Sequence, residues 1–134
     1  MALLRAREQV MARFRPMLAD HGINEQQWRV LRVLNEGGAL DAAELAARAN
    51  ILAPSLTRMI KAMTERGLIR RSKDETDGRR VILEIAPAGV ELIASVSPES
   101  HTIYRQLTEE FGADRLDTLL ALLDSLTEVL RTRD

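Results

Sequence analysis

Hydroxyl and cationic side chains in the middle of this chain are spaced for hydrogen bonding to nucleic acid. If residues 54–67 form a helix, one of its faces is polar and basic while the opposite face is apolar. Short hydroxyl groups suit phosphates and base edges, and arginine or lysine can donate to guanine or to phosphate. The polar candidates are Pro54, Ser55, Thr57, Arg58 and Lys61, and the apolar face carries Leu56, Met59, Ile60 and Met63.

A second, shorter helix is expected just before this one. Asp41 and Glu44 have the spacing of a capping box, and Asn50 marks a turn between the two helices. Pro54 suits a first helical turn, and Gly67 suits a helix end that needs a left-handed residue. A helix, a tight turn and a second helix with a basic outer face form the arrangement that places the second helix in a DNA major groove.

A β-hairpin is expected directly after the second helix. Two segments rich in Ile, Val and Leu, 68–73 and 79–85, flank a polar loop that closes on Asp77-Gly78. A hairpin in this position is a wing, which can reach an adjacent groove or phosphate. The alternative is an exposed hairpin whose charges only keep the protein soluble. The cations at the tip are Lys73, Arg79 and Arg80.

The charge of the chain is unevenly distributed. The net charge of -1 looks wrong for a DNA-binding protein, because affinity for DNA comes largely from neutralised phosphates. Residues 66–80, however, hold six Lys or Arg against three Asp or Glu, whereas residues 86–134 hold four against nine. The basic groups therefore gather where the DNA-binding motif is expected.

The residue inventory argues against an enzyme. The two histidines, His21 and His101, lie eighty positions apart, and the sequence has neither a metal-spaced cluster nor a glycine-rich phosphate loop. The absence of cysteine removes disulfides, thiolate catalysis and Cys-ligated zinc. We therefore expect no cofactor and no metal. Because no apolar run approaches the roughly eighteen residues of a membrane span and no signal-peptide core is present, a cytoplasmic protein is expected.

Both ends of the chain carry apolar helices that need a partner surface. Apolar residues recur seven apart over residues 3–18, and leucines step at three and four over 116–130. We also expect Ser97-Pro98 to break or kink the helix that opens at 86–89. The terminal helices predict a two-fold dimer. Its interface candidates are Leu4, Val10, Met11, Leu119, Leu123, Leu126 and Leu130.

In this order of elements, and in its motifs, the chain resembles the MarR family of winged-helix transcriptional regulators over its whole length. The motifs are GINEQQWRVL at 22–31, LAARA at 45–49, LTRMI at 56–60, ERGLI at 65–69 and DGRR at 77–80. Within the family, residues 21–32 resemble the repressors that control the degradation of homoprotocatechuate and related aromatic acids.

The resemblance implies a mainly α protein with a small β-hairpin wing (α+β). A single domain, 1–134, would carry a winged helix-turn-helix lobe at 24–85 between dimerisation helices at 1–20 and 86–134. Such a homodimer sits on a roughly palindromic operator and leaves it when a small, often aromatic, molecule binds. In the family, the arginine that matches Arg79 reaches the minor groove and the aspartate that matches Asp77 holds the wing. Because Asp77 would repel DNA, we expect it to pair with Arg79 or Arg80.

A further helix is expected before the helix-turn-helix, opened by the capping-box spacing of Asn24 and Gln27 and running up to Gly37. The effector pocket implied by the resemblance lies where the first helix of the chain meets the start of this helix and part of the fifth helix. Its candidates could supply a carboxylate partner, a hydrogen-bond donor and an aromatic wall. They are Arg15, His21, Trp28 and Arg32. For each of them a surface or core role stays open: Trp28 could fill the core, and His21 could meet the carbonyls at a helix end. A winged helix that binds protein, or that packs DNA without an effector, is the alternative function.

Overall fold

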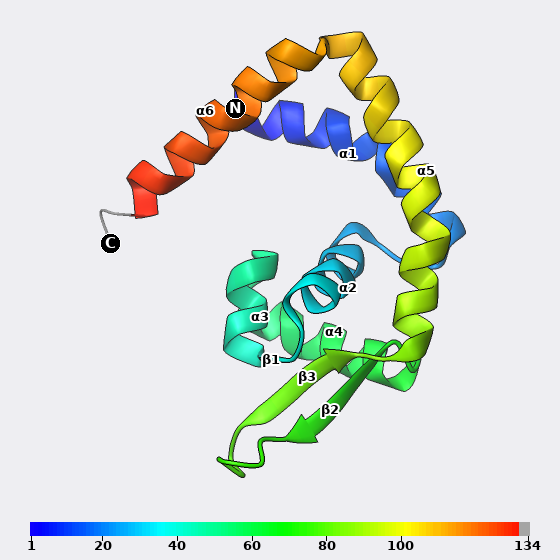
Figure 1. Cartoon of the computed structure of the whole chain (residues 1–134), viewed down its shortest axis with the longest axis vertical. Coiled ribbons are helices and arrows are strands. Elements are labelled where there is room, and N and C mark those ends of the chain that lie inside the picture. Colours follow the sequence, from blue (N-terminus) through cyan, green and yellow to red (C-terminus); the bar gives the residue numbers. More distant parts are fainter. Residues whose placement is uncertain (132–134) are drawn as a thin grey trace. The chain divides into compact units, whose positions relative to one another are not determined.

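Residues 1–131 of the chain are described by a computed structural model, in which helices dominate and a small antiparallel sheet is present (Figure 1). The last three residues of the predicted dimerisation segment 86–134 lie outside the described residues. The elements are α1 (Ala2–Asp20), α2 (Glu25–Gly37), β1 (Leu40–Asp41), α3 (Ala42–Ala49), α4 (Ala53–Glu65), β2 (Ile69–Lys73), β3 (Val81–Ile85), α5 (Pro87–Phe111) and α6 (Ala113–Arg131). The predicted fold class is confirmed.

The helix boundaries follow local signals in the sequence. Both expected capping boxes form. The side chains of Asn24 and Asp41 accept from the main-chain N–H groups of Gln27 and Glu44, respectively, and the side chains of Gln27 and Glu44 accept from the main-chain N–H groups of Asn24 and Asp41. Asn50 ends α3 in the left-handed region with φ 54°, and Gly67 follows α4 with φ 75°. The helix-turn-helix therefore has the predicted ends.

The sheet has one strand more than the sequence predicts. Its order is β1-β3-β2, and the two residues of β1 pair with Leu83 and Ile82 of β3. A two-residue strand is too short to show an alternating pattern, which is why the sequence does not reveal it. Its pairing joins the start of α3 to the base of the hairpin.

The third strand also begins later than predicted. β3 starts at Val81 rather than at residue 79, so Arg79 and Arg80 lie in the turn that precedes it. This turn is closed by two main-chain hydrogen bonds, from Asp74 N to Arg80 O at 2.8 Å and from Arg80 N to Asp77 O at 3.0 Å.

Proline does not break the fifth helix. α5 is continuous from Pro87 to Phe111 with Pro98 inside it, so the predicted break is wrong. A proline removes one main-chain donor, and the turns on either side can still hold the helical geometry. Val96, two residues before this proline, is fully buried.

The chain divides into two compact units, 1–99 and 100–134. In the first unit, α2, α3, α4 and the sheet enclose one apolar core. Trp28 belongs to the buried set, with 8% of its surface exposed, as the core interpretation of this residue requires. The fully buried side chains of this core are Val30, Leu31, Leu34, Leu45, Leu56, Met63, Ile69 and Leu83.

The first turn of α5 packs unusually close to the end of the helix-turn-helix. A Cβ atom at Gly89 would lie 2.4 Å from the main-chain oxygen of Leu68, so only glycine fits there. Leu68 O also accepts from Ala86 N at 2.9 Å. α5 therefore begins against the segment that links α4 to β2.

Candidate nucleic-acid interface

The outer face of α4 carries the predicted polar residues. Pro54, Thr57, Arg58 and Lys61 are exposed, whereas Leu56, Ile60 and Met63 are buried and fix the orientation of the helix. The Thr57 hydroxyl donates to the Ala53 carbonyl of the same helix at 3.1 Å. Within residues 1–131, neither Arg58 nor Lys61 has a side-chain hydrogen bond or ion pair, so both cations are available to a ligand.

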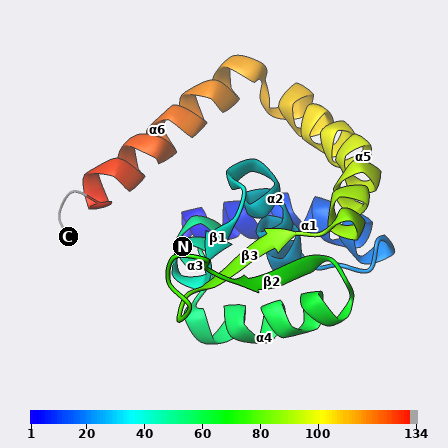
Figure 2. The ribbon, with the colours of Figure 1, turned by 60° about the horizontal axis from the view of Figure 1, so that its bottom comes forward.

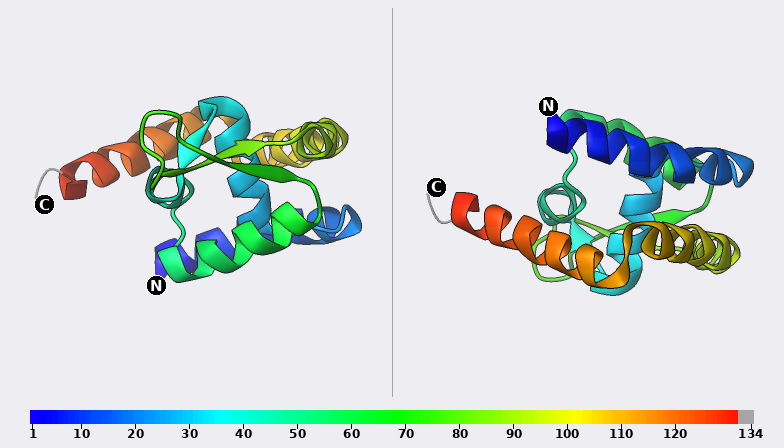
Figure 3. Two further views of the ribbon diagram at one scale, coloured as in Figure 1. Left: turned by 90° about the horizontal axis from the view of Figure 1, so that it is seen from below. Right: turned by 90° about the horizontal axis from the view of Figure 1, so that it is seen from above.

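The hairpin and α4 lie on the same side of the unit, so one ligand can contact both. Figure 2 shows α4 running alongside the hairpin, and the left view of Figure 3 looks onto the end of the unit where both lie toward the viewer. Lys73 and Arg79 are exposed at the tip of the hairpin, and neither makes a side-chain ion pair in the described part of the chain. α4 and the hairpin thus present free cations on one surface.

Asp77 orders the tip of the wing by pairing with Arg79, one of its two expected partners. Its Oδ1 accepts from the main-chain N–H of Arg79 at 3.1 Å. The contact uses the main chain because the tight turn places the Arg79 N–H two residues beyond the carboxylate. This contact leaves the Arg79 guanidinium free.

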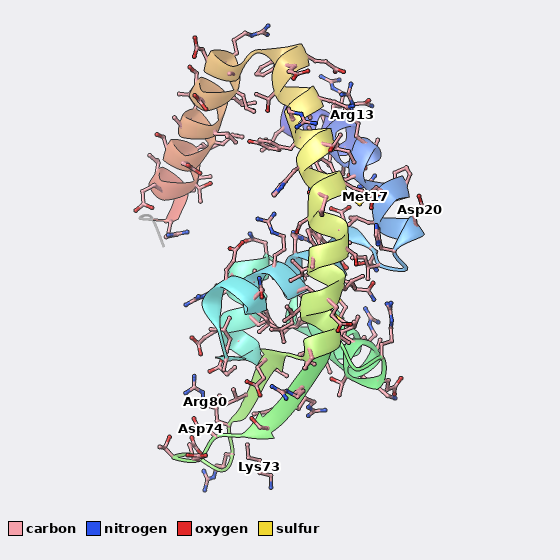
Figure 4. The ribbon with its side chains drawn as sticks, turned by 45° about the vertical axis from the view of Figure 1, so that its right-hand side comes forward. Arg13, Met17, Asp20, Lys73, Asp74 and Arg80 are labelled. Carbon is pink, nitrogen blue, oxygen red and sulfur yellow. The ribbon has the colours of Figure 1, made fainter. Side chains whose placement is uncertain are left out.

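Arg80 is turned toward its own chain. Its guanidinium contacts Asp41 at 2.8 Å, Glu44 at 2.7 Å and Asp74 at 3.4 Å, and Figure 4 shows it beside Asp74 on the hairpin. The hydrogen bond to Asp41 and the nearby acidic charges raise the pKa of Arg80. Sequence patterns place Arg80 among the DNA-binding candidates, yet carboxylates occupy its donors. Asp41 and Glu44 lie 39 and 36 positions before Arg80, so no local sequence signal indicates these contacts.

The effector candidates come from α1, α2 and the turn between them, and three of the four already have charged partners. Arg15 donates to Glu8 at 2.9 Å and to Glu25 at 2.8 Å, and these hydrogen bonds raise its pKa. Burial raises the pKa of Glu25, but hydrogen bonds and charges from Arg15 and Arg7 outweigh it and leave that pKa lowered. The ring of His21 contacts Glu99. The group is therefore an ordered charge network.

Arg32 is the most accessible cation of the four. Its guanidinium lies 5.9 Å from the centre of the Trp28 ring, and its ion pair with Glu36 is long, at 3.3 Å, and solvent-exposed. Exposed pairs of this kind contribute little to stability. Arg32 is therefore easier to recruit for a ligand than Arg15.

One contact between the turn after α1 and the helix-turn-helix has no signal in the sequence. Arg66, which caps the C-terminus of α4, donates to the main-chain oxygen of Gly22 at 2.8 Å. The two residues are 44 positions apart, and the acceptor is a main-chain atom, so the residue types do not indicate the contact. The contact links the region of the effector candidates to α4.

The dimer candidates on the first and last helices are apolar and largely uncovered. In the first unit, Leu4 and Val10 are exposed and Met11 is half-buried. In the second unit, the exposed residues extend beyond the predicted set to a broad stripe on α6. This stripe comprises Leu119, Leu120, Leu122, Leu126, Val129 and Leu130, with Leu123 half-buried among them. An apolar stripe of this width indicates a partner surface.

The described residues contain neither a metal-binding cluster nor a membrane-spanning helix. No group of three or more His, Cys, Asp or Glu side chains comes together there as a metal ion would require. None of the helices in residues 1–131 has the length and apolar character that crossing a membrane requires.

Comparison with known proteins places this geometry in a family. The MarR family model matches residues 23–81, which hold the helix-turn-helix and most of the wing. The homoprotocatechuate degradative operon repressor of Escherichia coli is 36% identical over 132 residues, covering 98% of this chain and 89% of the repressor. The chain belongs to the MarR family. This MarR-family chain is a winged-helix, DNA-binding transcriptional regulator that acts as a dimer.

Solved structures agree with the fold over nearly the whole chain. The structure of NadR in complex with 4-hydroxyphenylacetate is 38% identical, has a TM-score of 0.81, and the match covers 93% of this chain and 89% of NadR. The repressor CouR bound to a 23-mer DNA duplex is 30% identical with a TM-score of 0.88, and the match covers 94% and 89% of the two chains. Proteins similar to this regulator thus include one seen with DNA and one seen with an aromatic acid.

The free guanidinium at the wing tip leads to a prediction. Arg79→Ala should weaken operator binding by about tenfold and reduce the slope of log affinity against log salt by about one, since one phosphate or minor-groove contact is lost. Fluorescence anisotropy with operator DNA at four salt concentrations measures both quantities. Unchanged affinity and slope would show that the wing does not contact DNA.

Proposed function

We propose that this regulator is a repressor that occupies a palindromic operator and is released when a small aromatic acid or phenol binds, controlling genes for the breakdown of aromatic compounds. The exposed face of α4, with its unpaired Arg58 and Lys61 next to the wing, is the observation that carries the DNA-binding part. A two-fold dimer requires half-sites whose centres lie about one helical turn, some 10 base pairs, apart. A protein that acts on chromosomal DNA works in the cytoplasm, and the proposal includes that location.

In this proposal, DNA is contacted by residues from α4 and from the wing tip. Arg58 and Lys61 would donate to bases or phosphates of the major groove, with Pro54, Ser55 and Thr57 near the backbone. Arg79 and Lys73 would contact an adjacent minor groove or phosphate. The family relationship supports a regulator rather than an enzyme.

The proposed effector class rests on relatives and on Trp28 with Arg32. NadR is seen with 4-hydroxyphenylacetate, and the E. coli relative is named for an aromatic degradation operon. An aromatic carboxylate needs an apolar wall and a cation. The guanidinium of Arg32 can supply the cation, and the small exposed part of Trp28 beside it can supply part of the wall. Arg15 would first have to leave Glu8 and Glu25, so we propose it as a support of the pocket rather than as the main anion partner.

Ligand binding gives the test of this proposal. A ligand at one hundred times its dissociation constant should stabilise the folded protein by about 2.7 kcal/mol, raising the melting temperature by several degrees, and should lower operator affinity. We would use 4-hydroxyphenylacetate and a panel of related aromatic acids, measuring thermal unfolding and operator anisotropy on the same samples.

Two variants test whether Arg32 binds the carboxylate of the effector. Arg32→Gln should remove the response of both measurements to aromatic acids, while Glu36→Gln, which removes only its exposed partner, should keep the response. If no member of the panel changes either measurement in the wild type, the effector part of the proposal is refuted, while operator binding stands on its own.

The alternative is a winged helix that packs DNA without an effector. Genomic footprinting of the purified protein separates the two functions, because a repressor prefers its operator over bulk DNA by a factor on the order of a thousand or more. Protection spread evenly over the genome would favour the packing function.

A further inference from the structure

We propose that Arg80 is a positioning residue: it clamps the wing to the first turn of α3 and so holds Arg79 and Lys73 in the direction from which they reach DNA. The inference rests on the proposed operator binding and assigns to Arg80 a role other than DNA contact. It is carried by the geometry of four side chains, Arg80, Asp41, Glu44 and Asp74, which are called the wing clamp below.

The contacts of Arg80 join parts of the chain that are far apart in sequence. Nε donates to Asp41 Oδ2 at 2.9 Å, and Nη2 donates to Glu44 Oε1 at 2.7 Å, both at the start of α3. Nη1 lies 3.4 Å from Asp74 Oδ2 in the hairpin loop. A planar guanidinium with donors in a fixed fork can serve several carboxylates at once without losing further freedom. The group therefore bridges the loop to α3.

The two acceptors on α3 are already held in place before Arg80 reaches them. Asp41 Oδ1 accepts from Glu44 N at 2.8 Å as the N-cap, which leaves Oδ2 for Arg80. Glu44 Oε1 reaches back toward Asp41 N at 3.5 Å and also accepts from Arg80. Asp41 is further fixed by its pairing with Ile82 in the sheet. Isolated surface ion pairs are weak because both side chains must be ordered, but here that ordering is supplied by the capping box.

The acceptor in the loop is held in the same way. Asp74 Oδ1 accepts from the main-chain N–H of Thr76 at 3.0 Å and from its hydroxyl at 2.9 Å, while Oδ2 faces Arg80. These bonds to Thr76 hold the pKa of Asp74 below its usual value, so it stays charged. Asp74 therefore fixes the loop with one oxygen and joins the clamp with the other.

Outside the clamp, the outer part of the hairpin is held mainly by hydrogen bonds within its own loop. After Ile69, every residue of β2 is exposed, so no apolar packing holds the strand toward its tip. A two-stranded ribbon without an apolar face is only marginally ordered in water. Figure 4 shows Lys73, Asp74 and Arg80 close together at the outer end of the hairpin, where β2 passes into the loop. Loss of the clamp should therefore leave the tip free to change direction.

The clamp and simple electrostatics predict opposite changes in DNA affinity when acidic side chains of the clamp lose their charge. Removing a negative charge near bound DNA normally strengthens binding, because phosphates are repelled less. If Asp41 and Glu44 act through Arg80, removing their charges should instead weaken binding. Asn keeps the N-cap and Gln keeps the capping box, so Asp41→Asn with Glu44→Gln removes the ion pairs while α3 retains its start.

The test compares four variants with the wild type in operator binding at several salt concentrations. Arg80→Gln and the Asp41→Asn/Glu44→Gln double variant should each lose about tenfold in affinity, and Arg80→Gln should leave the salt slope near that of the wild type. The protein that combines all three substitutions should lose no more operator affinity than Arg80→Gln or the double variant alone, since each of the three proteins lacks the same interaction between Arg80 and α3. Glu75→Gln, an exposed acidic residue of the same loop outside the clamp, should bind as tightly as the wild type or more tightly.

Limited trypsin digestion supplies a measurement that does not depend on DNA. The double variant keeps Lys73 and Arg79 as cleavage sites, and its wing should be cut severalfold faster than that of the wild type at equal global stability. The proposal is overturned if the double variant binds like Glu75→Gln and is cut at the wild-type rate, or if Arg80→Gln lowers the salt slope by about one, as a DNA contact would. A wild type that binds no operator refutes the proposed function instead, and the digestion result still decides on the clamp.

Discussion

Leu126→Asp is expected to convert the protein into a monomer and to remove most of its operator affinity. Leu126 is 48% exposed on α6 within the apolar stripe, so the substitution does not open the core of one chain. In a dimer, it would place a carboxylate in the apolar contact between two chains, and an unpaired buried charge costs several kcal/mol. Because the proposed palindromic operator would be held by two copies together, a monomer should bind it about a thousandfold less tightly, near the non-specific level.

Light scattering and operator anisotropy measure the two effects. Ala121→Asp is the matched control: it adds the same charge to the same helix, about half a turn away from the apolar stripe, and should remain dimeric with full affinity. Circular dichroism shows whether both variants stay helical. A folded Leu126→Asp dimer would place the two-fold interface away from α6.

Arg58→Ala is expected to lower operator affinity between about tenfold and a hundredfold and to relax the preference for one base pair. The guanidinium of Arg58 is exposed on α4 and unpaired within residues 1–131, so it can donate two parallel hydrogen bonds to guanine. Such a bidentate contact contributes about 1–3 kcal/mol of discrimination.

Binding to a set of operators with single base-pair changes measures this preference. Arg58→Lys keeps the charge but not the forked donor, so it should recover non-specific affinity and not selectivity. Lys61→Ala should weaken binding to all sequences alike if Lys61 contacts phosphate, and Arg131→Ala, an equal change of charge at the end of α6, should have no effect. Equal operator preference in Arg58→Ala and the wild type would exclude Arg58 from base recognition.

Local signals in the sequence predicted most of the fold. Asn24, Asp41 and Asn50 act through bonds to residues at most four positions away, so their types and spacing suffice to mark the helix ends. The exposed set on α4 follows in the same way from helical periodicity. Pro98 was the failure of local reasoning, since the proline remains inside a helix whose adjacent turns hold it.

Long-range contacts account for what the sequence did not reveal about the site. Arg80 was predicted to face DNA because its type and its place at the wing tip are those of a DNA contact. The structure instead directs it to Asp41 and Glu44, residues whose own signals concern only the start of α3. Arg66 and the Gly22 carbonyl are a further pair of this kind. The DNA and effector roles of individual residues stay predictions, and the experiments above decide them.

The tight approach of Gly89 to Leu68 limits how the molecule can rearrange. One element can slide past another only if there is free space between them. A Cβ atom at Gly89 would lie only 2.4 Å from the Leu68 carbonyl oxygen, so α5 and the segment at Leu68 are in direct contact with no free space between them. A displacement of the first turn of α5 must therefore carry Leu68 with it and, through the Leu68 N to Met63 O hydrogen bond, the last turn of α4. We therefore expect the first turn of α5, Leu68 and the last turn of α4 to move together. Any conformational change that accompanies the proposed release from DNA should then occur elsewhere in the chain.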